Sequence, residues 1–448
     1  MVKVITYGTY DLLHFGHIRL LERAKALGDY LIVGVTADDF DKTRGKINVQ
    51  QTLMERVEAI KATGIADEII IEEYEGQKID DIKRYGIDIF TVGSDWVGTF
   101  DYLNEYCKVV YLDRTQGVSS SELRSENSNL KMGILGEGLL VSKHVNESSF
   151  VNGLEISAVC SLNDDVCAFA KKQNVLVADT YDELLKNCDA VYVISHPEKH
   201  YEHIKKALQN GKHVLCESPI ALKESNCKEL FDIAEEKKLI LMETVKTAFS
   251  TAYNRLMLLV KSGKIGEVTS IDATCTSMRD LNEAENPDYS KIWNSVCAWG
   301  PTAFLPVFQI LGTQYCDKKI VTRIINEENR FDAFTKVDFV YNNAVASVKV
   351  GKGVKSEGSL VISGTKGYVY VPSPWWKTDY FEIRYEDPAE NKRYFYQLDG
   401  EGIRYELVNF CKAVKTGRPD NYLGEKVSEE IVKVIEDYYS GKDTTYIK

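Results

Sequence analysis

Short apolar runs alternate with amphipathic stretches from the first residues of the chain onward. The run from 2 to 7 predicts a buried strand, which ends in a turn at Gly8 and Thr9. A helix is expected to begin near His14, because apolar residues recur at helical spacing after it, at Ile18, Leu20, Leu21 and Ala24. A strand, a tight turn and a helix N-terminus together favour an anion, since free backbone N–H groups and the helix dipole point at the turn.

The same pattern begins again at residue 131. A strand runs into a glycine turn at Gly136 and Gly138, and a helix follows. Further alternation predicts a doubly wound parallel sheet. The expected strands are 155–160, 175–178, 190–195 and 212–216, and the expected helices are 166–173 and 181–187.

Length and polarity divide the chain. At 448 residues it is too long for one ordinary domain, and the polar segment 125–129 marks a boundary. We expect domains at 1–127, 130–245 and 246–448. The net charge of −12 argues against nucleic acid or an anionic membrane as partner, so an anionic substrate must meet local positive sites.

The apolar runs and the cysteines point to a cytoplasmic protein. No run approaches a membrane span, and a core strand at the N-terminus leaves no room for a signal peptide. The ten cysteines include no CxxC pair, so we expect reduced core residues rather than a disulfide frame or a metal site.

Two histidines three residues apart carry the chemistry of the first domain. His14 and His17 direct two imidazoles at the anion site, and Gly16 lets a phosphate approach the backbone. A lone histidine on a helix is more often structural or solvated. A His-x-Gly-His motif directly after a strand is much less often structural than a lone histidine, and it indicates a nucleoside triphosphate site.

These residues resemble a known family. Segments 5–11, 20–25, 93–96, 100–103 and 114–120 are similar to the HxGH nucleotidyltransferases, and most of all to the bacterial glycerol-3-phosphate cytidylyltransferases, over 1–127. The resemblance implies that a polyol phosphate attacks CTP in line, giving a CDP-polyol and pyrophosphate, with Mg²⁺ on the triphosphate.

The resemblance also implies roles for residues. The catalytic set is His14, His17, Lys46 and Arg114, and the nucleotide-binding set is Thr9, Tyr10, Asp11, Gly16, Arg56, Asp95, Thr115 and Ser119. The alternative, non-functional interpretation of Lys46, Arg56 and Arg114 is a surface charge. One departure concerns the acceptor: the family commonly has another arginine where this chain has Thr63-Gly64. Glycerol 3-phosphate is therefore one choice within a class of small polyol phosphates.

The second pattern resembles the Gfo/Idh/MocA oxidoreductases over about 130–440. Segments 197–200, 211–219 and 261–268 carry the likeness, which implies bound NAD or NADP and a dimer or tetramer. The implied cofactor residues are Gly136, Gly138, Ser161, His196, Pro197, His200, Glu217 and Pro219. The family's second domain is an open, mainly antiparallel sheet, for which the candidate strands are 268–276, 337–341, 344–350, 358–363, 367–371 and 380–385, closed by helices near 403–416 and 424–439.

Departures from that family affect its catalytic residues. Ser218 replaces the lysine of Glu-Lys-Pro, and Ala298 and Thr302 replace the later aspartate and proton donor. Neither alanine nor threonine serves as a general acid near neutral pH. The acidic residue that grips the ribose is also missing at Cys160 and Ser161.

Three interpretations of the second half stay open. The first is an active reductase with a relocated acid, for which Lys246 and Tyr289 are candidates. The second is binding of a nucleotide or sugar phosphate without turnover, and the third is an assembly module. An active reductase would make the polyol phosphate from its keto-sugar phosphate, upstream of the cytidylyltransferase. Trp375 and Trp376 could stack a sugar or base, or form an oligomer interface.

Overall fold

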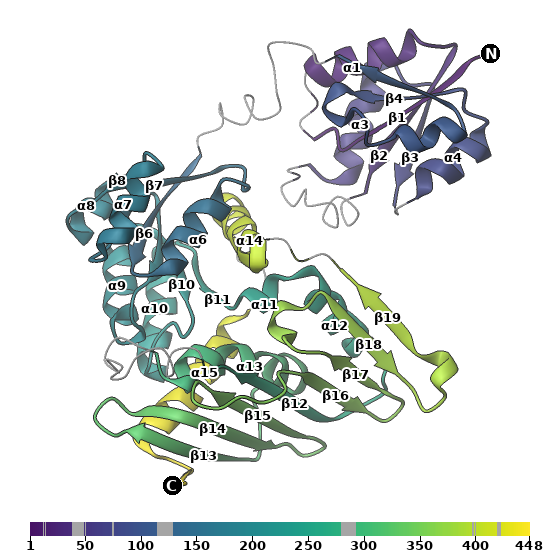
Figure 1. Ribbon diagram of the computed structural model, residues 1–448. Coiled ribbons are helices and arrows are strands. Elements are labelled where there is room, and N and C mark those ends of the chain that lie inside the picture. Colours follow the sequence, from purple (N-terminus) through teal and green to yellow (C-terminus); the bar gives the residue numbers. More distant parts are fainter. Residues whose placement is uncertain are drawn as a thin grey trace. The chain divides into compact units, whose positions relative to one another are not determined.

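The computed structural model describes most of the chain as two compact units, Met1–Asn129 and Leu130–Lys448 (Figure 1). The described residues are 1–11, 13, 15–37, 49, 51–73, 76–113, 129–278, 293–396, 398, 400–418 and 423–448, without the side chains of Phe15 and Asp95. Six predicted site residues lie outside this range, namely His14, Lys46, Arg114, Thr115, Ser119 and Tyr289. Their roles stay predictions.

The first unit is built on a parallel sheet in the order β3-β2-β1-β4-β5. Its strands are β1 (Lys3–Gly8), β2 (Tyr30–Thr36), β3 (Glu68–Glu72), β4 (Ile89–Gly93) and β5 (Lys108–Leu112). Its helices are α1 (Phe15–Lys25), α3 (Leu53–Thr63) and α4 (Gln77–Tyr85), with short 3₁₀ turns η1 (Ser94–Trp96) and η2 (Asp101–Glu105). Apolar clusters lie on both sides of the sheet, as expected for parallel strands covered on both faces.

Two glycines in this sheet make room for tyrosine rings. A Cβ on Gly34 of β2 would collide with the ring of Tyr7, and one on Gly8 would lie 2.9 Å from the ring of Tyr10. The Tyr7 hydroxyl donates to Asp81 at 2.9 Å. The ring of Tyr7 is therefore fixed between β2 and α4.

The second unit begins with a parallel sheet in the order β11-β10-β9-β6-β7-β8. Its strands are β6 (Leu130–Gly136), β7 (Leu154–Cys160), β8 (Leu176–Val177), β9 (Ala190–Ile194), β10 (His213–Glu217) and β11 (Leu241–Thr244). The helices are α6 (Leu139–Ser148), α7 (Asp164–Lys172), α8 (Tyr181–Lys186), α9 (Pro197–Gln209) and α10 (Glu224–Glu236). The predicted doubly wound sheet is confirmed.

A nine-stranded sheet follows, in the order β19-β18-β17-β16-β12-β15-β14-β13-β20. Its strands are β12 (Val268–Thr276), β13 (Asp317–Asn326), β14 (Phe331–Val340), β15 (Val345–Gly351), β16 (Leu360–Gly364), β17 (Tyr368–Val371), β18 (Tyr380–Arg384), β19 (Lys392–Phe395) and β20 (Thr444–Tyr446). Most pairs are antiparallel, as expected, while β12–β15 and β13–β20 are parallel. The expected strands omitted β13, β19, β20 and the first half of β14.

Helices cover and connect the two sheets of this unit (Figure 1). They are α11 (Lys246–Phe249), α12 (Thr251–Lys261), α13 (Ser295–Leu311), α14 (Ile403–Thr416) and α15 (Glu425–Ser440), with short 3₁₀ turns η3 (Trp375–Lys377), η4 (Pro388–Glu390) and η5 (Gly400–Gly402). The two closing helices agree with the expected ranges within a residue. Among the described residues, no helix is both long and apolar enough to cross a membrane.

Trp375 belongs to the core of this unit. Its side chain is fully buried, and its indole N–H donates to the carbonyl of Thr274 at 3.0 Å. Neither stacking on a ligand nor an oligomer interface applies to this residue. Trp376 packs instead against Trp299, with ring centroids 4.9 Å apart.

The close packing of Tyr7 on Gly34 predicts a stability difference between two glycine substitutions. Gly34→Ala forces the Tyr7 ring to move, and we expect it to destabilise the first unit by about 1–3 kcal/mol. Gly93→Ala is the control, because its Cβ would meet only Leu20, at 3.9 Å. Hydrogen exchange of the β1 and β2 amides in the full chain measures both. Equal protection in the two variants would contradict the packing argument.

Candidate functional sites

The turn after β1 has the predicted strand–turn–helix geometry. Tyr10 has a left-handed backbone (φ 54°), which is uncommon for a residue with a side chain and typical of functional turns. Asp11 is buried, and its carboxylate accepts from the backbone N–H of Gln51 at 3.0 Å. Gly16 and His17 lie in the first turn of α1, and the His17 ring stands edge-on to Tyr10 at 5.6 Å between centroids. The described part of this turn is thus shaped to present backbone N–H groups and one imidazole to an anion.

The side chain of Arg56 stabilises the turn after β1 by hydrogen bonds. Its guanidinium is fully buried and donates to the carbonyl oxygens of Thr9 at 2.7 Å and Thr36 at 2.8 Å. A further bond reaches the carbonyl of Gln51 at 3.2 Å. These contacts tie the turn after β1 to the end of β2 and to the start of α3. Phosphate binding by Arg56 stays a prediction, and these bonds assign it a positioning role as well.

A cavity of about 80 Å³ opens at the carboxyl ends of β1, β2, β3 and β4. It is lined by Tyr7, Gly8, Thr9, Thr36, Glu72, Lys78, Phe90, Val92, Trp96 and Phe100. Its walls therefore combine aromatic rings with one cation and one carboxylate. The predicted site residue Thr9 is one of its lining residues, so the cavity adjoins the nucleotide turn.

The cation in this cavity, Lys78, was not predicted from the sequence. Its ammonium pairs with Glu72 and lies 4.7 Å from the ring centroid of Tyr7 and 5.5 Å from that of Phe100. Lys78 and Glu72 are both buried, and Glu72 also accepts from the Thr36 hydroxyl at 2.9 Å. The sequence held a weak signal, because Lys78 stands one helical turn before the buried Ile82 and so shares its face of α4.

Burial also fixes the protonation of the cavity wall. It raises the pKa of the Tyr7 phenol well above its usual value, and the Asp81 carboxylate that accepts its hydrogen bond raises it further. Tyr7 is therefore a neutral donor at every physiological pH. The cavity presents the Lys78–Glu72 ion pair beside the turn.

The position of the missing family arginine is a helix end. Gly64 terminates α3 in a left-handed conformation (φ 67°), and its N–H donates to the carbonyl of Lys61. A glycine C-cap is the usual stop signal for a helix. The family's arginine therefore has no counterpart at this position.

In the second unit the predicted cofactor residues gather at one edge of the parallel sheet. Gly136 ends β6, Ser161 follows β7, His196 and Pro197 open α9 after β9, and Glu217 ends β10. The chain turns one way after β6 and the other way after β9, so neighbouring β6 and β9 form the switch point where dinucleotides bind.

The glycine turn fits a pyrophosphate. A Cβ on Gly136 would lie 2.7 Å from the backbone of Ile194, so the chain passes close to β9 there. At Gly138 (φ 84°), which caps α6, a Cβ would meet nothing within 4 Å. Open space thus lies directly before a helix N-terminus, where the free N–H groups favour a phosphate.

His200 joins the loops on either side of this edge. Its ring nitrogens lie 2.6 Å from the carbonyl oxygen of Ser195 and 2.7 Å from that of Pro219. Burial lowers the pKa of His200 to about 4, although both carbonyls favour the charged ring. A neutral ring donates to one carbonyl at a time, so His200 positions the two loops, and cofactor binding by His200 and Pro219 stays a prediction.

The replaced catalytic positions are occupied differently. The Ser218 hydroxyl donates to the buried Glu243, so the family's ammonium has no counterpart at that position. Ala298 and Thr302 lie on α13. The candidate Lys246 opens α11, and its positive charge opposes the rise in pKa that burial causes at Glu217 and Glu406.

The geometry defines two classes of protein in one chain: an α/β nucleotide-binding domain with an anion turn after its first strand, and a dinucleotide-binding Rossmann domain joined to a large sheet. Comparisons with known proteins agree with both. Residues 5–127 match the model described as cytidylyltransferase-like, and residues 130–245 match the oxidoreductase family with an NAD-binding Rossmann fold, Gfo/Idh/MocA.

Relatives support each half separately. The glycerol-3-phosphate cytidylyltransferase of Bacillus spizizenii is 46% identical over 130 residues, which is 29% of this chain and 100% of that protein. The inositol 2-dehydrogenase/D-chiro-inositol 3-dehydrogenase of Lactiplantibacillus plantarum is 28% identical over 168 residues, 36% of this chain and 46% of that protein. A solved 3-ketoreductase of Actinomadura kijaniata shares the fold, with a TM-score of 0.62, 19% identity, and coverage of 71% of this chain and 100% of that one. The chain belongs to the cytidylyltransferase-like family through its first unit, which is fused to a Gfo/Idh/MocA oxidoreductase domain.

The open space at Gly138 predicts that a substitution there weakens the binding of a dinucleotide. Gly138→Asp places a carboxylate before the helix N-terminus, and we expect the Kd of NADH or NADPH to rise at least about tenfold by charge repulsion. Gly153→Asp is the matched control, because Gly153 also has positive φ (77°) and open space. Fluorescence titration of the full chain measures both, and equal weakening would contradict the assignment.

Proposed function

We propose that the first unit joins CTP to a small polyol phosphate, with glycerol 3-phosphate the first candidate, and releases a CDP-polyol and pyrophosphate. The observation that carries this proposal is the cavity beside the nucleotide turn, where the Lys78 ammonium lies between aromatic walls. The 46% identity over the whole length of a glycerol-3-phosphate cytidylyltransferase supports the same reaction.

The chemistry follows from charge and placement. An oxygen of the acceptor phosphate forms a bond to the α-phosphorus of CTP while the bond from that phosphorus to the β-phosphate bridge breaks, and pyrophosphate leaves. His17 donates to phosphate oxygens where negative charge develops, so its effect belongs to the transition state. Lys78 holds the acceptor's phosphate in place of the arginine that is absent at Gly64, because its ammonium lies in the cavity beside the turn.

Mg²⁺ fits the donor set of this turn. The Asp11 carboxylate is an oxygen donor of the type that Mg²⁺ prefers, and the triphosphate supplies the others. When bound, Mg²⁺ neutralises charge on the leaving pyrophosphate. Arg56 keeps the turn in place by its bonds to Thr9 and Thr36.

We further propose that the second unit binds NAD or NADP at the β6–β9 switch point and reduces the keto-sugar phosphate that corresponds to the polyol. The glycine turn at Gly136 and Gly138 supports the binding of the dinucleotide. The alternative is a non-catalytic nucleotide- or sugar-binding or assembly module, which the residues at positions 218, 298 and 302 favour. The reductase would use Lys246 as its candidate acid. Measured turnover distinguishes the reductase from the non-catalytic module, because a pseudo-enzyme retains binding alone.

Loss of the His17 imidazole tests the first proposal. We expect His17→Ala to lower kcat for pyrophosphate release by about 10²–10³-fold, with a small change in the KM for CTP, because the lost hydrogen bond strengthens in the transition state. His17→Gln keeps an N–H donor and is expected to retain more activity. Pyrophosphate release with CTP, Mg²⁺ and a panel of polyol phosphates is the measurement. Activity of His17→Ala within twofold of wild type would refute the assignment.

A second pair of variants tests the acceptor site. Lys78→Met keeps the length of the side chain and removes the charge, and we expect the KM for the polyol phosphate to rise at least about tenfold while that for CTP changes less than about twofold. Lys83→Met, on the exposed side of the same helix, is the control. A parallel rise in both KM values would assign Lys78 to the nucleotide instead.

A further inference from the structure

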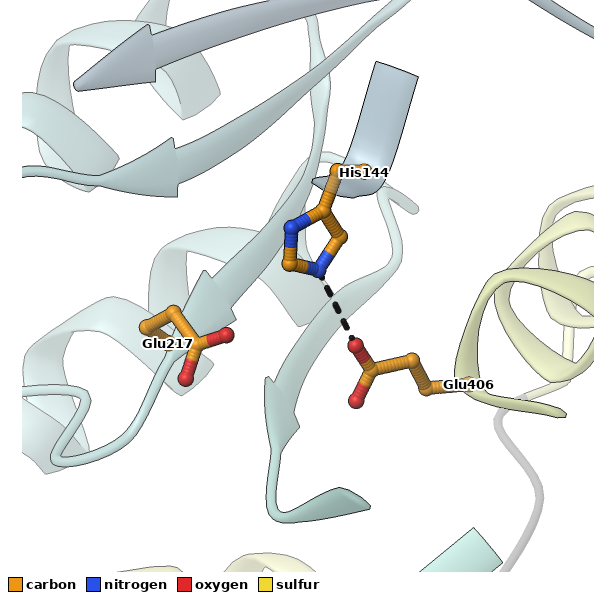
Figure 2. Close-up of side chains that lie close together, drawn as sticks. All are labelled: His144, Glu217 and Glu406. Carbon is orange, nitrogen blue, oxygen red and sulfur yellow. Dashed lines mark hydrogen bonds and ion pairs between the residues drawn. The ribbon is translucent and has the colours of Figure 1, made fainter. Parts of the chain in front are cut away.

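Three ionisable side chains from distant parts of the second unit meet at one point (Figure 2). His144 comes from α6, Glu217 from the end of β10 and Glu406 from α14. One nitrogen or oxygen of each lies within 4.8 Å of the others. The side chains of His144 and Glu406 are at most 1% exposed, and Glu217 is partly buried.

The tautomer of His144 is set by the backbone. Its Nδ1 lies 2.7 Å from the carbonyl oxygen of Leu140, which only accepts, so Nδ1 carries the proton. Burial lowers the pKa of His144 to about 4, so the ring is neutral and Nε2 offers a lone pair. A backbone carbonyl that fixes Nδ1–H is the usual support of a histidine that binds a metal through Nε2.

The carboxylates have more acceptor capacity than the surrounding donors fill. Glu406 Oε1 lies 3.2 Å from His144 Nε2, and the Tyr192 hydroxyl donates to Glu217 Oε1 at 2.7 Å. Glu406 Oε2 is buried, and no described residue forms a hydrogen bond with it. A buried oxygen without a partner is costly, so this oxygen is a candidate ligand atom for a cation.

We propose that His144, Glu217 and Glu406 form a binding site for a divalent cation of the zinc type. One imidazole with two carboxylates is a donor set that favours Zn²⁺ over Mg²⁺ or Ca²⁺, which prefer oxygen alone. Ligand atoms at zinc–ligand distances of about 2.0–2.1 Å in a tetrahedron lie about 3.3–3.4 Å apart. The 3.2 Å between His144 Nε2 and Glu406 Oε1 is close to this separation.

A shared proton is the competing occupant. Burial raises the pKa of Glu406 to about 8, so at neutral pH a protonated Glu406 donates to His144 Nε2 when no cation is bound. A metal ion would displace that proton. The Lys246 ammonium acts on the cluster as well, and it offsets one of the two carboxylate charges.

The bound cation would link three elements that are far apart in the sequence. It would fasten α14 to the Rossmann sheet at the end of β10, one residue before Ser218. Its expected role is therefore structural. The inference does not depend on the reaction proposed for either unit.

Metal analysis of the full chain tests the proposal. Protein stripped with a chelator and dialysed against Zn²⁺ is expected to hold one equivalent more in wild type than in Glu406→Gln. The matched control is Glu430→Gln, a buried carboxylate on α15 that accepts from Tyr315 at 2.7 Å, and it should keep that equivalent. The difference between variants excludes zinc bound by the first unit. Co²⁺ in place of Zn²⁺ is expected to give the strong d–d bands of a tetrahedral site, and these should vanish in Glu406→Gln.

Two results would overturn the proposal. Equal zinc content and equal cobalt spectra in wild type and Glu406→Gln would assign the cluster to a shared proton. Displacement of Zn²⁺ by equimolar Mg²⁺ would contradict a zinc-type site. Should Glu406→Gln fail to fold, as judged by circular dichroism, Glu217→Gln gives the same comparison, since it removes a different ligand charge.

Discussion

A buried nitrogen donor joins two neighbouring loops at the carboxyl edge of each parallel sheet. In the first unit, the Arg56 guanidinium binds the carbonyl oxygens of Thr9 and Thr36. In the second, the His200 ring bridges Ser195 and Pro219. Loops at this edge carry backbone carbonyls that strands and helices leave unpaired, and an unpaired buried carbonyl costs about 1–3 kcal/mol. Arg56 removes that cost for both of its carbonyls and His200 for one carbonyl at a time, and both side chains hold neighbouring loops together.

The carboxyl edge of each sheet also explains why the candidate site residues of that unit lie close together. Parallel strands direct their carboxyl ends, and the helix N-termini that follow, toward one side of the sheet. In the first unit this gathers the nucleotide turn, Arg56 and the Lys78 cavity, although their elements are separated in sequence. In the second unit it gathers the glycine cradle and the loop that holds Ser218. One fold principle thus places both the candidate nucleotide turn and the candidate dinucleotide turn at the carboxyl edge of a parallel sheet.

Local patterns allowed much of this to be predicted from the sequence. The strand–turn–helix at residues 2–24 and its repeat at 131–141 depend on short-range periodicity and glycine, and the two closing helices show clear helical spacing. The first half of β14 and all of β13 were missed because charged residues interrupt their apolar alternation, and pairing between the two strands stabilises them. Lys78 and His144 were missed because their meaning comes from distant contacts. Lys78 needs the rings of Tyr7 and Phe100, and His144 needs Glu406, 262 positions away.

We propose that the two halves act on one carbon skeleton. The most direct test supplies the full chain with CTP, Mg²⁺, NADPH or NADH, and the ketone phosphate that corresponds to the accepted polyol phosphate, with no polyol phosphate added. For glycerol 3-phosphate that ketone is dihydroxyacetone phosphate, whose reduction consumes one hydride from the nicotinamide and one proton. Mass spectrometry is predicted to detect the CDP-polyol only when the reduced nicotinamide is present. Formation of the CDP-polyol from added polyol phosphate, but never from the ketone, would contradict the claim and leave the second unit as a binding or assembly module.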